Sequence, residues 1–196
     1  MRVQVICAHP LAESFTGAVH ARVVGALGSA GHEVVATDLY REGFRPAMSG
    51  EERLAYYAAG RNTGEVQDYV DRLLWADALV FCFPVWWHDM PAMLKGYFDR
   101  VWVPGVAFDI PDGGGPLRPG LTHVRGLGVV TSFGAPWWYV RLWMGDPVRR
   151  VFRRAIRPLL AKRARCLYLA HYGLDRPDEG REARFLEKVE RAFARF

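Results

Sequence analysis

Cysteine is scarce in this chain of 196 residues, which contains three: Cys7, Cys82 and Cys166. They lie far apart, and each falls in or beside an apolar run typical of a strand. An odd number of widely spaced cysteines argues against a disulfide framework and against a zinc knuckle. We therefore expect no metal site and a reducing, cytoplasmic location.

Long apolar runs are also missing. No segment approaches the roughly 18 consecutive apolar residues of a membrane-spanning helix, so we expect no membrane span. The first residues lead directly into an apolar, strand-like segment, and we expect no signal peptide. Because 51% of the residues are hydrophobic, a disordered chain is excluded, and the length suits a single domain over residues 1–196.

Two common phosphate-binding motifs are absent as well. The chain has no G-x-G-x-x-G run and no Walker lysine, which disfavours the usual dinucleotide-binding and P-loop classes. Positive charge, in contrast, is plentiful: the net charge is +5, and much of the excess lies between residues 141 and 165. This basic segment is open to interpretation as a solvated helix face or as a docking surface for phosphorylated anions. A nucleic-acid partner is not expected, because no recognition motif accompanies the charge.

Apolar, strand-like runs alternate with helical patterns along the chain. Strands are expected at residues 3–8, 32–38, 78–83, 125–131 and 165–170. Helices are expected at residues 15–30, 64–76, 91–101, 146–161 and 178–196. This alternation predicts an α/β fold in which a five-stranded parallel sheet is covered by helices on both faces.

The loop after the first strand carries polar groups without glycines. His9 and Ser14 lie in the segment Ala-His-Pro-Leu-Ala-Glu-Ser-Phe-Thr, residues 8–16, and Ser14 stands where a helix N-cap belongs. A helix N-terminus with free N–H groups, a hydroxyl and an imidazole can form an anion site. The alternative is that Ser14 only caps the helix and that His9 only packs.

The loop after the third strand is rich in aromatic residues. The strand at 78–83 is followed by Pro84, by two adjacent tryptophans, Trp86 and Trp87, and by His88. Loops beyond the carboxyl ends of parallel strands are where open α/β sheets bind ligands. Two tryptophans on such a loop need either the core or a flat aromatic ligand to cover them.

The loop after the fourth strand combines small polar residues with further aromatics. Residues 131–136 are Thr-Ser-Phe-Gly-Ala-Pro, and Trp-Trp-Tyr follows at 137–139. The two tryptophans could also form a hydrophobic plug or a subunit contact. In the strand order 2-1-3-4-5, strands one, three and four are neighbours, so their loops converge. A phosphate site and two aromatic walls predict a pocket for a phosphorylated flat heterocycle, and a flavin fits better than a nicotinamide because the pyrophosphate fingerprint is missing.

Several short runs match one family in order over roughly the first 140 residues. They are Ala-His-Pro at 8–10, Ser-Phe at 14–15, Asp-Leu-Tyr at 38–40, Phe-Pro at 83–84, Trp87, Met-Pro-Ala at 90–92, Leu-Lys-Gly at 94–96 and Asp-Arg at 99–100. On these residues the chain resembles the flavodoxin-like NAD(P)H:quinone oxidoreductase family, which includes DT-diaphorase, modulator-of-drug-activity proteins and ancillary flavoproteins of potassium efflux systems. The resemblance implies a flavodoxin-like fold, a non-covalently bound flavin and a homodimer with active sites at the subunit interface.

By position, the resemblance implies three groups of flavin contacts and one catalytic residue. The segment that holds the flavin phosphate is matched by His9, Ser14, Phe15 and Thr16. The loop along the isoalloxazine ring is matched by Pro84, Val85, Trp86, Trp87 and His88. A Thr-Thr-Gly-Gly loop near the pyrimidine end of the ring is matched by Thr131, Ser132, Phe133 and Gly134. Tyr139 matches a tyrosine that assists hydride transfer together with a downstream histidine.

Two departures from the family pattern concern the reaction. Phe133 stands in place of a glycine, which predicts a narrower approach to the ring. The downstream histidine is absent, since Trp-Met-Gly-Asp occupies residues 143–146, and Tyr139 is therefore expected to act alone. His88 is the alternative proton donor, although a histidine beside aromatic residues more often has a packing role.

The expected activity is hydride transfer from NAD(P)H through the flavin to a quinone or a similar flat acceptor, in a ping-pong cycle. FAD is the expected flavin and FMN the alternative, while the sequence does not choose between NADH and NADPH. The rival hypothesis is a flavin-binding regulatory subunit of a transport system with little turnover of its own. In that case the basic surface at residues 149–165 would dock a partner.

Overall fold

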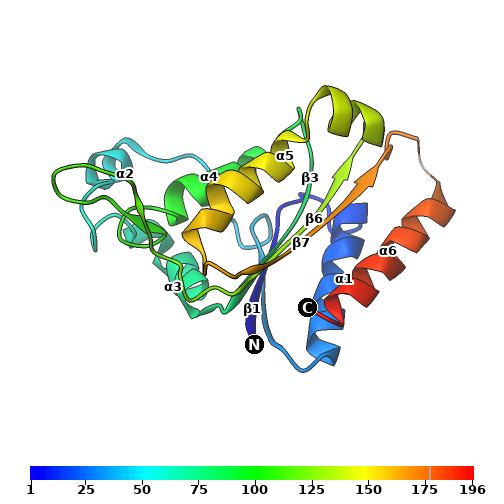
Figure 1. Ribbon diagram of the computed structural model, residues 1–196, viewed down its shortest axis with the longest axis horizontal. Helices are drawn as coiled ribbons and strands as arrows, with labels where there is room; N and C mark the ends of the chain where they lie inside the picture. The colour runs from blue at the N-terminus through cyan, green and yellow to red at the C-terminus, as the bar shows by residue number, and fades with distance from the viewer. Residues whose placement is uncertain (177) are drawn as a thin grey trace.

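A central parallel sheet organises the computed structural model, which describes residues 1–176 and 178–196 (Figure 1). Its five strands are β1 (Arg2–Cys7), β2 (Glu33–Asp38), β3 (Ala78–Pro84), β6 (Gly126–Phe133) and β7 (Arg165–Tyr172). They pair in the order β2-β1-β3-β6-β7, and all four pairings are parallel. The predicted five-stranded sheet and its strand order are confirmed, although β6 and β7 each end two residues later than expected.

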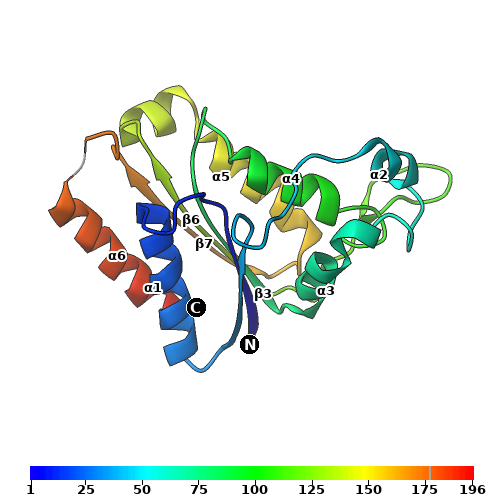
Figure 2. The same cartoon turned by 180° about the vertical axis from the view of Figure 1, so that it is seen from behind.

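Helices cover both faces of the sheet (Figures 1 and 2). On one face α1 (Phe15–Ser29) packs against α6 (Glu179–Phe193). The other face carries α3 (Gln67–Trp75), α4 (Ala92–Val101) and α5 (Pro147–Val151). After α5 the chain continues through a π-helical segment, Phe152–Ile156, and a 3-10 turn, Arg157–Leu159. The single regular helix predicted over 146–161 is therefore wrong in its detail, because Pro158 removes a helical N–H and breaks the regular ladder.

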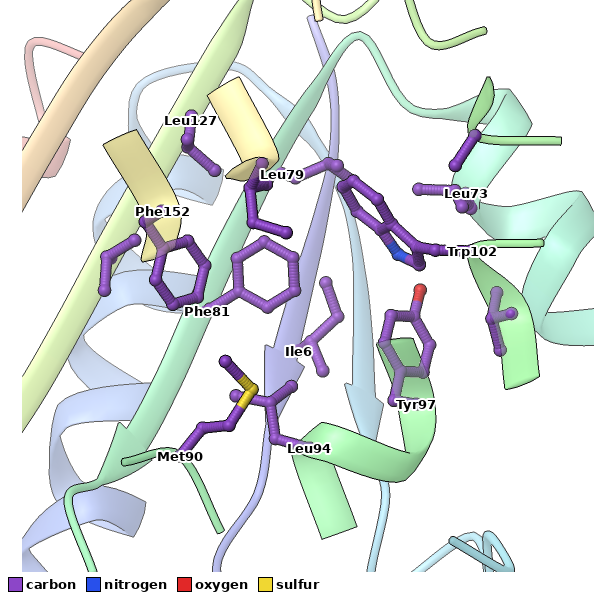
Figure 3. Close-up of a cluster of buried hydrophobic side chains, with 14 of the residues drawn as sticks. Ile6, Leu73, Leu79, Phe81, Met90, Leu94, Tyr97, Trp102, Leu127 and Phe152 are labelled. Atoms are coloured by element: carbon purple, nitrogen blue, oxygen red, sulfur yellow. The ribbon is translucent and has the colours of Figure 1, made fainter. Parts of the chain in front are cut away.

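Each face of the sheet has its own apolar core. Below α3, α4 and α5 the core is rich in aromatic rings, and the centroid of Phe81 lies 5.3 Å from Phe152 and 6.4 Å from Trp102 (Figure 3). The opposite core joins Val80 of β3 to Phe193 of α6. Every residue of β3 is buried, which explains why its sequence is continuously apolar. The two cores hold the carboxyl ends of β1, β3 and β6 in fixed relative positions.

Two excursions extend the fold beyond the predicted elements. Before α3 lie α2 (Gly50–Ala55) and a 3-10 turn, Gly64–Val66, so the helix predicted over 64–76 starts as a 3-10 turn. After α4 a small antiparallel pair forms from β4 (Phe108–Asp109) and β5 (Arg118–Pro119). Both excursions lie on the side of the molecule away from α1 and α6 (Figure 1). Across the described residues, none of the helices combines the length and the apolar character needed to cross a bilayer.

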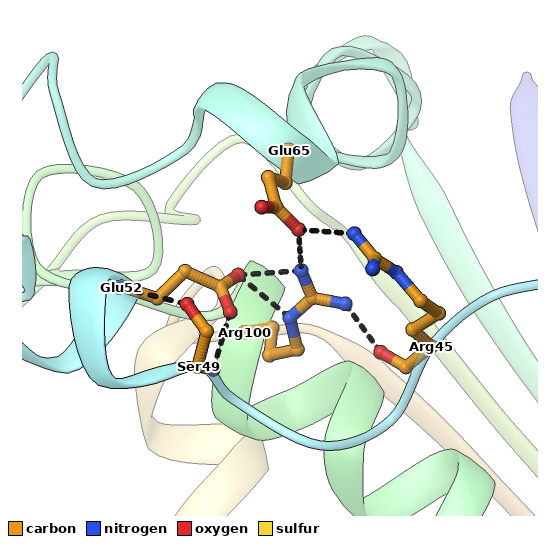
Figure 4. Close-up of polar contacts among 5 residues, drawn as sticks. All are labelled: Arg45, Ser49, Glu52, Glu65 and Arg100. Carbon is orange, nitrogen blue, oxygen red and sulfur yellow. Dashed lines mark hydrogen bonds and ion pairs between the residues drawn. The ribbon is translucent and has the colours of Figure 1, made fainter.

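A buried arginine attaches the first excursion to α4 (Figure 4). Arg100 is 3% exposed, and its Nε donates to Glu52 Oε1 at 2.7 Å while its Nη2 donates to Glu65 Oε2 at 3.1 Å. A third bond runs from Nη1 to the carbonyl oxygen of Arg45. A buried guanidinium needs partners of this kind, because an unpaired charge in the interior is strongly unfavourable.

Candidate functional site

The loops that follow β1, β3 and β6 meet at one end of the sheet. The ring of His9, after β1, lies 5.9 Å from that of Trp86, after β3. The ring of His88, on the same β3 loop, lies 5.7 Å from that of Tyr139, after β6. The predicted convergence of the three loops is therefore observed, and it falls at the switch point where open α/β sheets bind ligands.

A strained turn forms the tip of the β3 loop. Trp86 and Asp89 exchange two backbone hydrogen bonds of 3.0 Å, which closes a two-residue hairpin turn. Its central residues, Trp87 and His88, have φ angles of +51° and +62°, a region that favours glycine or asparagine. The turn leaves Trp87 97% exposed. Two adjacent bulky residues in this conformation cost stability, and such strain is typical of functional sites.

A hollow of about 410 Å³ opens between the β3 and β6 loops. Its lining comes from three segments: Val85, Trp86, Trp87, His88, Phe133, Gly134, Ala135 and Asp175. The Phe133 ring is 2% exposed and stacks on Tyr172 at 15°, so this residue contributes to the floor of the hollow. The hollow is small, apolar on two sides and flanked by titratable groups, as binding sites commonly are.

Thr131 and Ser132 are not among the side chains that line this hollow. The Thr131 hydroxyl is buried and donates to the carbonyl oxygen of Phe83 at 2.7 Å. Ser132 Oγ is also buried and finds no hydrogen-bond partner among the described residues. Both residues border a narrow internal space beside α1. The loop therefore presents Gly134 and Ala135 to the hollow, rather than its two hydroxyl groups.

The N-terminus of α1 has the properties of an anion site. Ser14 is its N-cap, as predicted: Ser14 Oγ accepts from the Gly17 N–H at 3.1 Å and donates to the Leu11 carbonyl at 2.7 Å. In the described part of the chain, the amides of Phe15 and Thr16 have no acceptor. Free first-turn amides and the positive end of the helix dipole favour a phosphate. His9 is held beside this turn, since the Leu11 N–H donates to its Nδ1 at 3.0 Å.

A second, basic cleft of about 550 Å³ adjoins the start of α1. Phe15 links the two, because its ring lies 5.1 Å from His171 and 5.9 Å from Phe185, and both of these residues line the cleft. Four cations line the same cleft: Arg141, Arg181, Arg184 and Lys188. Flat aromatic surface beside several cations suits an anion that carries a planar group.

His171 is a buried titratable group in this cleft. Burial lowers the pKa of His171, and the nearby Arg181 guanidinium lowers it further. Its Nδ1 is buried without a hydrogen-bond partner among the described residues. Because a charged imidazole would be poorly solvated between Phe15 and Phe185, the neutral form is favoured near neutral pH.

Several site residues are missing from the sequence-based prediction. Asp175 lines the hollow and rests on Gly134, where a Cβ would lie 2.2 Å from the Asp175 Oδ1 atom. An acidic residue in a short polar loop carries no signal that would single it out. The cations of α6 do leave a signal, because Arg181, Arg184 and Lys188 have the spacing of one helix face.

A family model described as the flavodoxin-like fold matches residues 1–162. The chain belongs to this flavodoxin-like family. The matched residues include the β1, β3 and β6 loops. One side of the basic cleft lies beyond the matched range, namely the side formed by Arg181, Arg184 and Lys188.

Individual relatives of this flavodoxin-like chain carry oxidoreductase names. It is 40% identical over 121 residues to the ribosyldihydronicotinamide dehydrogenase-like protein traD of Penicillium crustosum, covering 54% of this chain and 45% of that protein. It is 38% identical over 112 residues to the uncharacterized NAD(P)H oxidoreductase YcaK of Escherichia coli, covering 55% of each. The chain spans about half the length of these curated relatives.

Similarity to a solved structure extends over nearly the whole chain. An NAD(P)H:quinone oxidoreductase from Methanothermobacter marburgensis superposes with a TM-score of 0.81 and 28% sequence identity. That comparison covers 99% of this chain and 98% of the other. The last strand and helix, which the family model does not match, thus have counterparts in a solved member of the fold.

Proposed function

We propose that this flavodoxin-like protein is a flavin-dependent NAD(P)H:quinone oxidoreductase. The observation that carries the proposal is the meeting of three strand-end loops around an aromatic hollow beside the free N-terminus of α1. Such a site offers a phosphate position and flat walls without a glycine-rich fingerprint. The names of the relatives and of the similar solved structure support the same reaction class.

The described residues fit a flavin. The amides of Phe15 and Thr16 would hold its phosphate, since they lack acceptors within the described chain. The isoalloxazine ring would lie in the hollow between the 85–88 segment and Gly134. The Asp175 carboxylate, at the hollow's edge, would accept a hydrogen bond from the ring's imide N–H.

FAD fits better than FMN because of the basic cleft. The cleft lies against Phe15, next to the proposed phosphate position, and it holds about 550 Å³. Arg184 and Lys188 would neutralise the second phosphate, and the exposed indole of Trp137 offers a face for an adenine ring. FMN would leave this cleft unused.

When bound, the flavin supplies the redox chemistry by accepting hydride from NAD(P)H and passing it to the quinone. The protein's contribution is to position both substrates in turn and to shield the hollow from water. Trp87 is exposed at the mouth of the hollow, and its indole would cover a flat substrate there. One hollow used successively by nicotinamide and quinone corresponds to a ping-pong cycle.

His88 and Tyr139 together would supply the proton that the quinone needs. The sequence favours either residue acting alone, because the usual downstream histidine is missing. Their rings lie 5.7 Å apart between centroids, so a histidine from the β3 loop stands near the tyrosine of the β6 loop. We propose that Tyr139 donates to the reduced quinone oxygen and that His88 restores the tyrosine proton.

We also propose a homodimer whose interface includes the π-helical segment Tyr139–Trp143. Four large apolar side chains in or beside this segment are more than half exposed: Trp137, Trp138, Leu142 and Trp143. Exposed aromatic residues this close together are typical of interface centres rather than of free surface. Light scattering at micromolar concentration tests the proposal, and a monomeric mass would contradict it.

Two measurements on the purified protein test the proposed activity. Mass spectrometry of the released cofactor should identify FAD. Steady-state assays should show rapid quinone reduction that depends on NAD(P)H and displays parallel-line ping-pong kinetics. Tight flavin binding with negligible turnover would overturn the enzyme proposal and favour the regulatory subunit instead.

A further inference from the structure

A third cavity lies away from the strand-end loops. It is a slot of about 710 Å³ between the helical segment after residue 146 and two neighbouring strands, β6 and the edge strand β7. Its β7 residues lie at the start of that strand, whereas the proposed flavin hollow lies beyond the strand's other end. The slot shares no lining residue with the hollow or with the basic cleft.

The base of the slot is formed by apolar side chains of the core. Leu127 and Val129 reach it from alternate positions of β6, and Phe152 reaches it from the helical segment. Cys166 and Tyr168 are the corresponding alternate residues of β7 and are paired in register with Leu127 and Val129. Leu127, Val129 and Phe152 are each 3% exposed or less, so the accessible apolar surface of the slot comes from Cys166, Leu167 and Tyr168 of β7.

The rim of the slot is cationic. Arg149, Arg153 and Arg157 follow one another at four-residue spacing, so they lie along one side of the helical segment. All three are exposed, and none of them forms an ion pair within residues 1–176 and 178–196. The Arg149 guanidinium lies 5.6 Å from the Tyr168 ring, above the floor.

We infer that this slot binds an anionic amphiphile of the fatty-acid class. The hydrocarbon chain would lie along Cys166, Leu167 and Tyr168, and the carboxylate would meet the guanidinium groups of Arg153 and Arg157. A volume of about 710 Å³ is within the usual range for small-molecule sites, roughly 300–1,000 Å³. Charge complementarity selects the anion, because three free cations border the slot and no carboxylate is among its lining residues.

Cys166 provides a built-in reporter for this inference. It lines the slot and is exposed, whereas Cys7 and Cys82 are buried. The rate at which a soluble thiol reagent modifies Cys166 therefore measures how open the slot is. The probes are decanoate below its micellar concentration, decanol with the same chain but no charge, and butyrate with the same charge but a short chain.

Decanoate should slow Cys166 modification at least fivefold and in a saturable manner. Decanol should bind at least tenfold more weakly, and butyrate should not protect. Between octanoate and decanoate the affinity should rise about fourfold per methylene, as expected for hydrocarbon that leaves water.

The double variant Arg153→Gln, Arg157→Gln should weaken decanoate binding about tenfold and leave decanol binding unchanged. Arg154→Gln is the matched control, because it removes a charge from the same segment without lining the slot, and it should bind decanoate like the wild type.

Three results would overturn the inference. The first is the absence of protection by decanoate, and the second is equal protection by decanoate and decanol in the wild type and the double variant. The third is slow modification of the free protein that speeds up on dilution, which would mean that a second copy of the chain covers the slot. Circular dichroism of each variant confirms that the fold is retained.

Discussion

The rings of His88 and Tyr139 lie next to each other beside the proposed active site, with 5.7 Å between their centroids and an angle of 47° between their planes. They come from different strand-end loops, β3 and β6, and this contact brings a histidine to the tyrosine that lacks its expected partner. This contact matters for the proposed reaction, because a phenol alone is a weak proton donor near neutral pH and His88 would restore the tyrosine proton.

Tyr139→Phe and His88→Ala should each slow reoxidation of the reduced protein by quinone, by about ten- to hundredfold. If the residues act as one relay, the double variant should be no slower than the slower single variant. Flavin reduction by NAD(P)H should stay near the wild-type rate in all three. Stopped-flow measurement of both half-reactions checks this, and multiplicative losses in the double variant would show that the two residues act independently.

Trp87→Gly should raise the free energy of unfolding by about 1 kcal/mol. The positive φ of Trp87 costs stability, and glycine relieves it, although the greater freedom of glycine in the unfolded chain offsets part of the gain. Little packing is lost, since Trp87 is 97% exposed. Trp143→Gly is the matched control: it is 79% exposed but lies in a helical backbone, and it should destabilise the protein. Urea unfolding measures both, and a less stable Trp87→Gly would disprove the strain argument.

Arg184→Gln combined with Lys188→Gln should weaken FAD binding about tenfold and leave FMN binding unchanged. The two cations line the basic cleft, which only the adenosine monophosphate half of FAD would reach. Titration of apoprotein with each flavin provides the comparison. Equal losses for FAD and FMN would mean that the cleft does not hold the second half of the cofactor.

Acidification should destabilise the protein through His171. Because burial lowers the pKa of His171 in the folded state, its contribution to stability is complete above the unfolded pKa of about 6.5 and is lost as the pH falls below that value. Unfolding free energies at pH 7.5 and 5 should therefore differ less for His171→Gln than for the wild type. Part of the slope should remain, since burial also lowers the pKa of His20. Identical slopes for the two proteins would contradict this account.

The sheet could be predicted from sequence because its signals are local. Continuous apolar runs mark strands covered on both faces, and Ser14 marks the start of α1 by the chemistry of a cap. The strand order then brings three loops together, so the neighbourhood of His9, Trp86 and Tyr139 follows from sequence as well.

The parts that sequence missed depend on contacts between distant segments. In the sequence Asp175 is an ordinary loop residue, and only the fold shows that it lies against Gly134. The sequence also does not reveal that the hydroxyls of Thr131 and Ser132 are buried, on opposite faces of β6. The left-handed turn at Trp87 and His88 also escapes prediction, because neither residue type prefers that conformation.

The most direct test of the account is the absorbance of protein-bound flavin during one complete cycle. Apoprotein is loaded with FAD, mixed anaerobically with NADPH or NADH, and then mixed with a quinone. We expect saturable binding of one flavin per chain, rapid bleaching of the flavin by at least one nicotinamide and full recovery of its absorbance with the quinone. Ser14→Glu, which sets a carboxylate at the proposed phosphate position, should lose flavin affinity more than Ser14→Ala does. No saturable binding of either flavin, or a bound flavin that neither nicotinamide reduces, would contradict the proposed function.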